Sequence, residues 1–233
     1  HHWLHGHTVA DHPNWYSANL QLQLGLGCYL GVVCVAGSQG HHSQLGRYVA
    51  KTLCDNNPGQ FAEMVTDSGS ATIDEIRKQG DSVGGVISAY ITGCPVGLGE
   101  PVFDKLHATL GHAMLSINSV KGVEFGDGFA GADLRGSEHN DAPSLDGTVQ
   151  SNHEGGITGG ISNGRPVTLR IAFKPVSSIA KDQLAYSSDG QVQKLKIDGR
   201  HDALVLPRAL PIVEAMAALA LADALLLQKI HLK

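Results

Sequence analysis

Aromatic residues are scarce in this 233-residue chain, at 5% of the total, and cysteine occurs only four times. No Cys-X-X-Cys pair occurs among Cys28, Cys34, Cys54 and Cys94. Neither a disulfide framework nor a cysteine zinc site is therefore favoured. The irregular spacing is better explained by small buried side chains in a reducing compartment.

An excess of positive charge is also missing. The chain has 17 Lys and Arg against 22 Asp and Glu, which gives a formal net charge of -5. A nucleic-acid-binding protein normally shows a basic stripe, so nucleic acid is not an expected partner. No basic region followed by an apolar run opens the sequence, so no signal peptide is expected. A cytoplasmic protein without a membrane partner is the resulting expectation.

Glycine is abundant, with 29 residues, which is well above the usual share of about 7%. There is no Gly-X-Y period, which excludes collagen, and the 42% hydrophobic content is too high for a disordered chain. The length allows one large domain or two small ones with a substantial core. Many glycines indicate tight turns and backbone that closely approaches another group.

The first 70 residues contain few clear signals. Four histidines between residues 1 and 7 suggest a metal-binding segment, a tag remnant or a truncated start. A strand containing Val32, Val33 and Val35 is predicted between Leu20 and Ala36. Residues 56–59 (NNPG) predict a turn. The rest of residues 1–70 is left unassigned.

A strand–helix–strand order is predicted from residue 70 onward. Acidic residues early and basic residues late predict a short helix over 72–79, ended by Gly80. A second helix is expected to open at Glu100-Pro101 after a loop at 95–99. Its apolar face would comprise Val102, Leu106, Leu110 and Ala113, and strands are expected at 85–92 and 120–125.

The second half combines a long polar stretch, a strand and an apolar helix. Residues 127–158 have few apolar anchors, which is typical of a functional lid or a disordered segment. Strict alternation predicts a strand at 167–173, with Arg170 and Lys174 opposite its apolar face. The last helix is expected from Pro211 to Lys229. It is long enough to span a membrane, but its charged residues and alanines favour a core or subunit-interface helix.

Gly155–Gly160 (GGITGG) is the first of three segments that suggest chemistry. It does not match G-X-G-X-X-G and it precedes a strand, so a dinucleotide phosphate site is not favoured. Paired glycines allow the backbone to lie flat against a planar ligand. A tight hairpin without a ligand is an equally good interpretation.

The other two segments carry charge. Lys174 ends a strand and is followed by two hydroxyls in KPVSS, a pattern that suits a phosphate or an anionic ring edge. A solvated loop is the alternative. Asp202 follows Arg200 and precedes Arg208, and a carboxylate near an arginine stays ionised and can assist a proton transfer. Surface salt pairing is the alternative here.

Seven blocks of the sequence resemble those of the chorismate synthase family, in the right order and spacing. The resemblance runs from about Glu75 to Leu226, about two thirds of the chain. The blocks are GDSVGG (80–85), PVGLGEPVFDKL (95–106), SINSVKGVEFGDGF (116–129), RGSEHND (135–141), SNHEGGITGGISNGRPV (151–167), AFKPVSSI (172–179) and GRHD…PRALPIVEAMAALALAD (199–223).

This resemblance implies a fold and a reaction. The fold would be α/β (α+β), a β-α-β sandwich with helices between sheets, assembled as a homotetramer. The enzyme would be a phosphate lyase of the shikimate pathway, which leads to aromatic amino acids. It would convert 5-enolpyruvylshikimate 3-phosphate to chorismate by a 1,4-elimination of phosphate, using reduced FMN. Whether NADPH reduces the flavin is left open.

The resemblance also implies roles for individual residues. Asp202 matches the carboxylate proposed to help deprotonate the flavin at N5. The residues that match flavin contacts are Asn118, Ser119, Gly159, Lys174, Pro175, Val176, Ser177, Ser178 and Arg200. Three positions differ from the usual pattern: Ser119 replaces an alanine, Val176 replaces a threonine, and Ala203-Leu204 replaces Pro-Cys.

The family's N-terminal blocks are not found in residues 1–70. These are the GESHG block, the arginines for the substrate's phosphate and carboxylates, the GHAD histidine and the RSSAR run. The expectation is therefore a single domain over 1–233 that lacks, or misreports, the N-terminal part. Two alternatives remain: a flavin-binding but catalytically incompetent fragment, and an unrelated α/β scaffold with a glycine hairpin.

Overall fold

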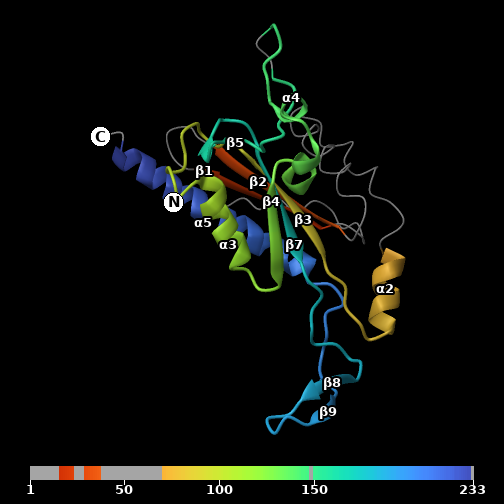
Figure 1. Cartoon of the computed structure of the whole chain (residues 1–233). Coiled ribbons are helices and arrows are strands. Elements are labelled where there is room, and N and C mark those ends of the chain that lie inside the picture. Colours follow the sequence, from red (N-terminus) through yellow and green to blue (C-terminus); the bar gives the residue numbers. More distant parts are fainter. Residues whose placement is uncertain (1–15, 24–28, 38–69, 147–148, 232–233) are drawn as a thin grey trace.

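A five-stranded antiparallel sheet forms the centre of the molecule in the computed structural model, which describes residues 16–23, 29–37, 70–146 and 149–231 (Figure 1). The histidine-rich opening and the expected turn at 56–59 lie outside these ranges, as do Cys28 and Cys54. The strands, in spatial order, are β1 (Tyr16–Gln23), β2 (Tyr29–Gly37), β3 (Gly85–Thr92), β7 (Val167–Phe173) and β4 (Val120–Phe125).

The expected strand–helix–strand unit is confirmed, with one strand inserted. β3 and β4 both pair antiparallel with β7, so they run parallel to each other on either side of it. Helix α3 (Leu106–Leu115) connects them. The predicted alternation in β7 holds, because Val167, Leu169, Ile171 and Phe173 are all buried. A strand in the 20–36 region is also confirmed, as β2.

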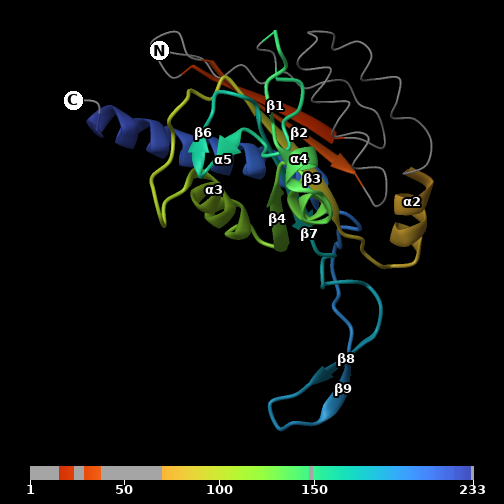
Figure 2. The ribbon, with the colours of Figure 1, turned by 45° about the horizontal axis from the view of Figure 1, so that its top comes forward.

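Two helices pack side by side against one face of this sheet (Figure 2). Helix α5 (Leu206–His231) contacts β1, β2 and β3, and α3 lies against β4 and α5. Helix α2 (Ser70–Lys78) matches the expected short helix. The largest fully buried side chains come from the sheet and both packed helices: Ile87, Ile91, Leu98, Leu106, Leu110, Met114, Leu169, Ile171, Leu206 and Leu221.

Helix α3 begins at Leu106, six residues later than the sequence predicts. The N–H of Glu100 donates to the carbonyl oxygen of Asp104 at 3.0 Å, which closes a turn before the helix. The N–H of Leu106 is bonded at 2.8 Å to Gly160, so tertiary pairing fixes the first helical residue. Val102, expected on the apolar face, is therefore 69% exposed.

Helix α5 begins at Leu206, earlier than expected, with Pro207 in its first turn and Pro211 in its interior. Proline is well tolerated in the first turn, where its missing N–H has no helical partner. By length and composition α5 could cross a membrane, with a mean hydropathy of 2.0. One stripe of it nevertheless packs on the sheet, through Leu206, Leu210, Val213, Ala217 and Leu221, which confirms the packing interpretation.

The long polar stretch is organised by short elements. Residues 127–158 contain the 3-10 helix Gly128–Asp133, helix α4 (Gly136–His139) and strand β5 (Ile157–Thr158). β5 pairs with β6 (Ile161–Ser162), and β8 (Gln183–Tyr186) pairs with β9 (Val192–Leu195) in a hairpin that projects from the body (Figure 1). Cys94 is a free, buried thiol, as predicted.

Glu214 is a buried carboxyl on α5, at 5% exposure, and its Oε1 atom has no hydrogen-bond partner among the described residues. Burial raises its pKa from 4.5 to about 7. The unfolded chain therefore loses this proton at lower pH than the folded protein. The free energy of unfolding should fall as pH rises from 4.5 to 7, by about 3 kcal/mol, and level off above.

Glu214→Gln should remove this part of the pH dependence. Urea unfolding of the parent and the variant at pH 4.5 and pH 8 provides the measurement. Glu75→Gln on α2, whose side chain is exposed, is the matched control and should keep the parental pH dependence. An unchanged pH dependence in Glu214→Gln would show that the proton is taken up elsewhere.

Candidate functional site

Most of the candidate residues gather at one end of the sheet, where β7 ends and β3 and β4 begin. Asn118 and Ser119 form the turn before β4. The N–H of Lys174, directly after β7, donates to the carbonyl oxygen of Ser119 at 2.9 Å. We call this group the β7-end cluster; it comprises Ser82, Asn118, Ser119, Lys174–Ser178 and Asp202.

The loop at 80–85 holds the cluster together. Ser82 Oγ donates to the carbonyl oxygen of Val176 at 2.6 Å. The N–H of Val83 donates to the carbonyl oxygen of Ala203 at 2.8 Å. This loop thus connects the segment after β7 with the segment before α5. Sequence reasoning did not identify Ser82 as a site residue, although the block GDSVGG contains it.

Lys174 brings a positive charge and neighbouring hydroxyls into the cluster. Its Nζ donates to the carbonyl oxygen of Pro175 at 3.2 Å and to Ser177 Oγ at 3.4 Å. Both bonds stay within its own loop, so the ammonium is held over the segment that follows β7. An ammonium beside a hydroxyl is a donor set that suits phosphate and other anions.

Asp202 pairs with Arg208, which lies in the first turns of α5, and not with Arg200. The carboxyl is about one-third exposed, so it remains accessible from solvent. His201 is turned to Ile197, whose carbonyl oxygen lies 2.8 Å from His201 Nε2. Arg200 is exposed at the start of this segment. Sequence reasoning noted Arg208 but did not assign it to the site.

Ser119 adopts a left-handed backbone conformation, with φ of 73°. This region is costly for residues other than glycine and is often used at functional sites. Here it turns the carbonyl oxygen of Ser119 toward Lys174, which couples the turn before β4 to the loop after β7.

Gly159 lies away from the cluster. It occupies the tip of the β5–β6 hairpin with Gly160, where both residues have positive φ values of 63° and 99°. Two positive φ angles define the two-residue hairpin turn that glycine favours. The structure therefore brings together the candidates of the β7 end and leaves Gly159 at the opposite end of α3, where the carbonyl oxygen of its neighbour Gly160 accepts a hydrogen bond from Leu106.

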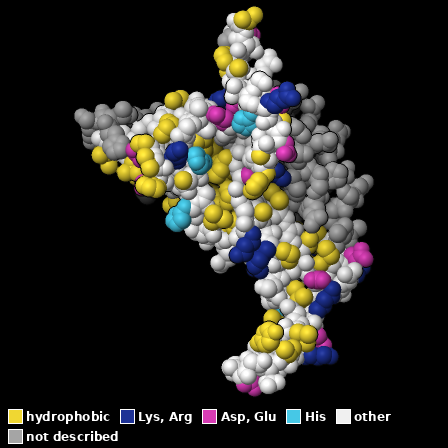
Figure 3. Space-filling model, viewed as in Figure 1, with side chains coloured by type: hydrophobic (Ala, Val, Ile, Leu, Met, Phe, Trp, Pro, Cys, Tyr) yellow, Lys and Arg dark blue, Asp and Glu magenta, His cyan; other side chains and the backbone are white. Residues whose placement is uncertain are grey.

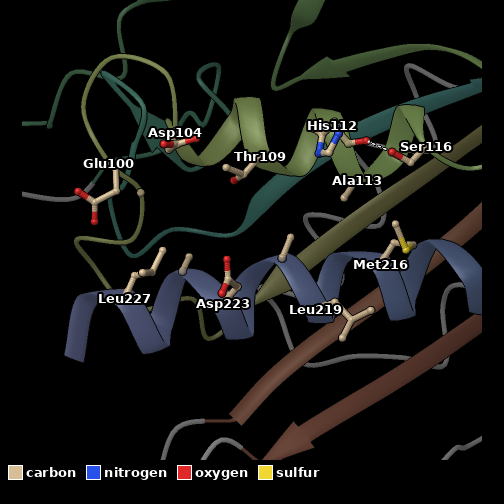
Figure 4. Close-up of a pocket in the computed structure, with 13 residues that line it drawn as sticks. Glu100, Asp104, Thr109, His112, Ala113, Ser116, Met216, Leu219, Asp223 and Leu227 are labelled. Carbon is tan, nitrogen blue, oxygen red and sulfur yellow. Dashed lines mark hydrogen bonds between the residues drawn. The ribbon is translucent and has the colours of Figure 1, made fainter. Parts of the chain in front are cut away.

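A groove of about 540 Å³ lies between α3 and α5 (Figure 4). Met216, Leu219 and Leu227 give it an apolar side, whereas Asp104 and Asp223 bring negative charge from its two walls. This charge does not suit an anionic ligand. Within the described ranges, no group of three or more His, Cys, Asp or Glu is arranged to hold a metal ion.

Glycine is required at position 84, because the loop after β7 packs too closely there for any side chain. An added Cβ would lie 2.4 Å from the carbonyl oxygen of Phe173 and 3.0 Å from Pro175. We expect Gly84→Ala to displace the loop after β7 and to cost about 1–3 kcal/mol. Gly136→Ala is the matched control, because its Cβ would meet nothing within 4 Å. Thermal unfolding of both variants tests this, and equal stability would contradict it.

The fold and the site define a mixed α/β protein with a cationic, hydroxyl-lined cluster at the end of an antiparallel sheet. The family model of chorismate synthase matches residues 31–226. A solved chorismate synthase structure superposes with a TM-score of 0.54 at 33% identity, over 68% of this chain and 42% of that one. The chain therefore belongs to the chorismate synthase family.

Curated relatives agree with this assignment. The chorismate synthase of Flavobacterium psychrophilum is 57% identical over 159 residues, which is 68% of this chain and 45% of the relative. That of Parabacteroides distasonis is 54% identical over 203 residues, covering 86% of this chain and 55% of the relative. The chain thus spans about half the length of the curated relatives it matches.

Proposed function

We propose that this chain carries the flavin site of an enzyme that converts 5-enolpyruvylshikimate 3-phosphate to chorismate by 1,4-elimination of phosphate. The β7-end cluster is the observation that supports this proposal. Segments far apart in sequence meet there: Lys174 bonds to Ser119, and the loop at 82–83 bonds to Val176 and to Ala203, the residue after Asp202. The alternative of an unrelated α/β scaffold does not predict that these segments lie together.

The donor set of the cluster fits an anionic, planar cofactor such as FMN. Lys174 supplies a cation, and Ser177 and Ser178 supply hydroxyls beside it. Arg200, two residues before Asp202, adds an exposed guanidinium. When bound, reduced FMN supplies the electron needed to expel phosphate from a substrate whose departing hydrogen is not acidic. NADPH is one source of the reducing equivalents.

Asp202 is proposed to accept a proton at the flavin N5 position. Its partner Arg208 approaches from α5 and fixes the orientation of the carboxyl group, which acts best as a base when positioned. Ser82 bonds to Val176, and the N–H of Val83 bonds to Ala203. The loop at 82–83 therefore connects the segment that carries Lys174 with the segment that carries Asp202. The chain's own contribution is therefore binding, orientation and proton transfer.

The remaining features of the proposal concern the protein as a whole. We infer one domain, because β3, β4, β5, β7, α3 and α5 share one hydrophobic core. We further propose a cytoplasmic enzyme of aromatic amino acid biosynthesis that assembles as a homotetramer. Its partner is the small-molecule substrate and not nucleic acid or a membrane.

Flavin titration tests the cofactor assignment. The fluorescence of FMN should decrease on binding. FMN should also bind more tightly than riboflavin, because the cationic cluster favours the phosphate group. Higher salt should reduce this preference, since it screens charges that are partly exposed. An absence of FMN binding, or equal affinities for the two flavins at low salt, would contradict the assignment.

A further inference from the structure

Asn163 and Gly164 form the only Asn-Gly pair in the 233-residue chain, and they lie in the segment between β6 and β7. An asparagine that precedes glycine is chemically labile, because the next backbone nitrogen can attack Cγ of its side chain. Glycine carries no side chain that would shield this nitrogen. Whether the folded chain permits the reaction depends on the groups around the pair.

The nitrogen of Gly164 is available for this attack. Its N–H has no hydrogen-bond partner among the residues that the structure describes, and the residue is exposed. Its φ of 85° lies in the region that glycine adopts readily. A Cβ added here would lie 2.8 Å from Val96 Cγ2, so a side chain is disfavoured. The local structure therefore favours the one residue type that leaves the nitrogen unshielded.

The side-chain amide of Asn163 is held at both of its polar atoms. The N–H of Arg165 donates to Asn163 Oδ1 at 3.0 Å. Asn163 Nδ2 donates to Thr158 Oγ1 at 3.1 Å. When a nucleophile attacks Cγ, negative charge develops on Oδ1, and an N–H that already points at this atom stabilises that charge. The backbone of Arg165 thus supplies an oxyanion donor to the reacting amide.

We propose that Asn163 is a site of spontaneous deamidation, promoted by the N–H of Arg165. The nitrogen of Gly164 gives its proton to solvent and forms a bond to Cγ of Asn163. The bond from Cγ to Nδ2 breaks, and ammonia leaves with a proton from water. Water then opens the succinimide ring at one of its two carbonyl groups, which gives aspartate or isoaspartate. This inference is independent of the proposed flavin site.

The products do not fit the contacts that Asn163 makes with the β5–β6 hairpin. Thr158 gives its only hydroxyl hydrogen to Glu154, so it can accept from an amide at position 163 but cannot also donate to a carboxylate there. Isoaspartate would lengthen the backbone beside Gly156, whose carbonyl oxygen accepts from the N–H of Asn163. A Cβ added to Gly156 would lie 2.5 Å from the carbonyl oxygen of Pro166, so space is short. Deamidation should therefore loosen the hairpin.

Incubation of the protein at pH 8.5 and at pH 6, followed by peptide mass spectrometry, measures conversion at each asparagine. At the higher pH the nitrogen of Gly164 loses its proton more readily. Conversion at Asn163 should then be about tenfold faster than at Asn118, which is exposed but precedes serine. Enzymatic methylation specific for isoaspartate should label the peptide that contains residue 163. An intact Asn163, or conversion no faster than at Asn118, would overturn the proposal.

Anion-exchange chromatography separates the modified protein, because each conversion adds one negative charge. The formal net charge of the parent is -5, and Lys and Arg side chains are interspersed with Asp and Glu over the face in Figure 3. A later-eluting species should accumulate at pH 8.5. Asn163→Ser removes the reacting amide and should abolish this species. Its undiminished formation in Asn163→Ser would place the reaction at another residue.

Two variants of Arg165 test the role of its backbone N–H. Arg165→Pro lacks the N–H that bonds to Asn163 Oδ1, whereas Arg165→Ala keeps it, and both lose the guanidinium group. Arg165→Ala should deamidate at the parental rate and Arg165→Pro about tenfold more slowly. Cooperative thermal unfolding of both variants is the control for folding. Equal rates in the two folded variants would overturn the promotion by this N–H.

Asn163→Asp reproduces one product directly. It should lower the midpoint of thermal unfolding by about 2–4 °C, the shift expected for the loss of one hydrogen bond in a chain of this size. Asn118→Asp adds the same charge at a side chain that has no hydrogen-bond partner in the described structure, and its midpoint should be unchanged. Equal midpoints for the parent and Asn163→Asp would contradict the expected loosening of the hairpin.

Discussion

Asp202→Asn is expected to lower the turnover number about 100-fold or more while changing the FMN dissociation constant less than about threefold. Loss of a positioned general base typically costs a factor of 10²–10⁴ in rate. The amide keeps the size of the side chain and a hydrogen bond to Arg208, so cofactor binding should persist. Anaerobic turnover and flavin titration of the same preparation give the two numbers.

Asp198→Asn is the matched control for this experiment. Asp198 is an exposed carboxyl four residues earlier in the same segment, and it has no contact with the cluster in the described structure. Its replacement should leave turnover and FMN affinity unchanged. If Asp202→Asn instead reduces both quantities to the same extent, Asp202 has a structural role and is not the base.

Lys174→Ala should weaken FMN binding about 10- to 100-fold, which corresponds to the loss of a hydrogen bond to a charged group worth roughly 1.5–3 kcal/mol. The backbone N–H of residue 174 still bonds to Ser119 in the variant, so the fold of the loop after β7 should be preserved. Fluorescence titration with FMN is the measurement.

Lys181→Ala provides the comparison for Lys174. Lys181 lies just before the β8–β9 hairpin and pairs with Asp81 at 2.6 Å, outside the group that bonds to Ser119 and Val176. A similar positive charge is removed in both variants, so a general electrostatic effect would weaken binding equally. Only the Lys174 variant should lose affinity, and an unchanged affinity in that variant would refute its role.

Strand β7 was predictable because its side chains alternate, whereas strand β1 and the pairing order of the sheet were not predicted. Strand β7 has a two-residue period from Val167 to Phe173, and the structure buries those side chains. The residues at which helices begin were harder to predict from the local sequence. α3 starts where Leu106 bonds to Gly160, a residue 54 positions away along the chain, and no pattern near residue 100 contains that information.

The candidate site was predictable in its residue types but not in its arrangement. The motifs identified Lys174 and Asp202, because a strand-end lysine and an arginine-flanked carboxylate are recognisable locally. They did not identify Arg208 as the partner of Asp202 or Ser82 as the residue that bonds to Val176. They also gave no sign that Gly159 lies far from the other flavin candidates, since that separation depends on the packing of α3.

Product analysis under anaerobic conditions tests the central claim most directly. The protein is supplied with 5-enolpyruvylshikimate 3-phosphate and dithionite-reduced FMN, and phosphate and chorismate are both quantified. The account predicts equal amounts of the two products, no reaction with oxidised FMN, and no net consumption of the reduced flavin. Flavin binding without release of either product would contradict the proposed reaction and would favour a flavin-binding chain without this activity.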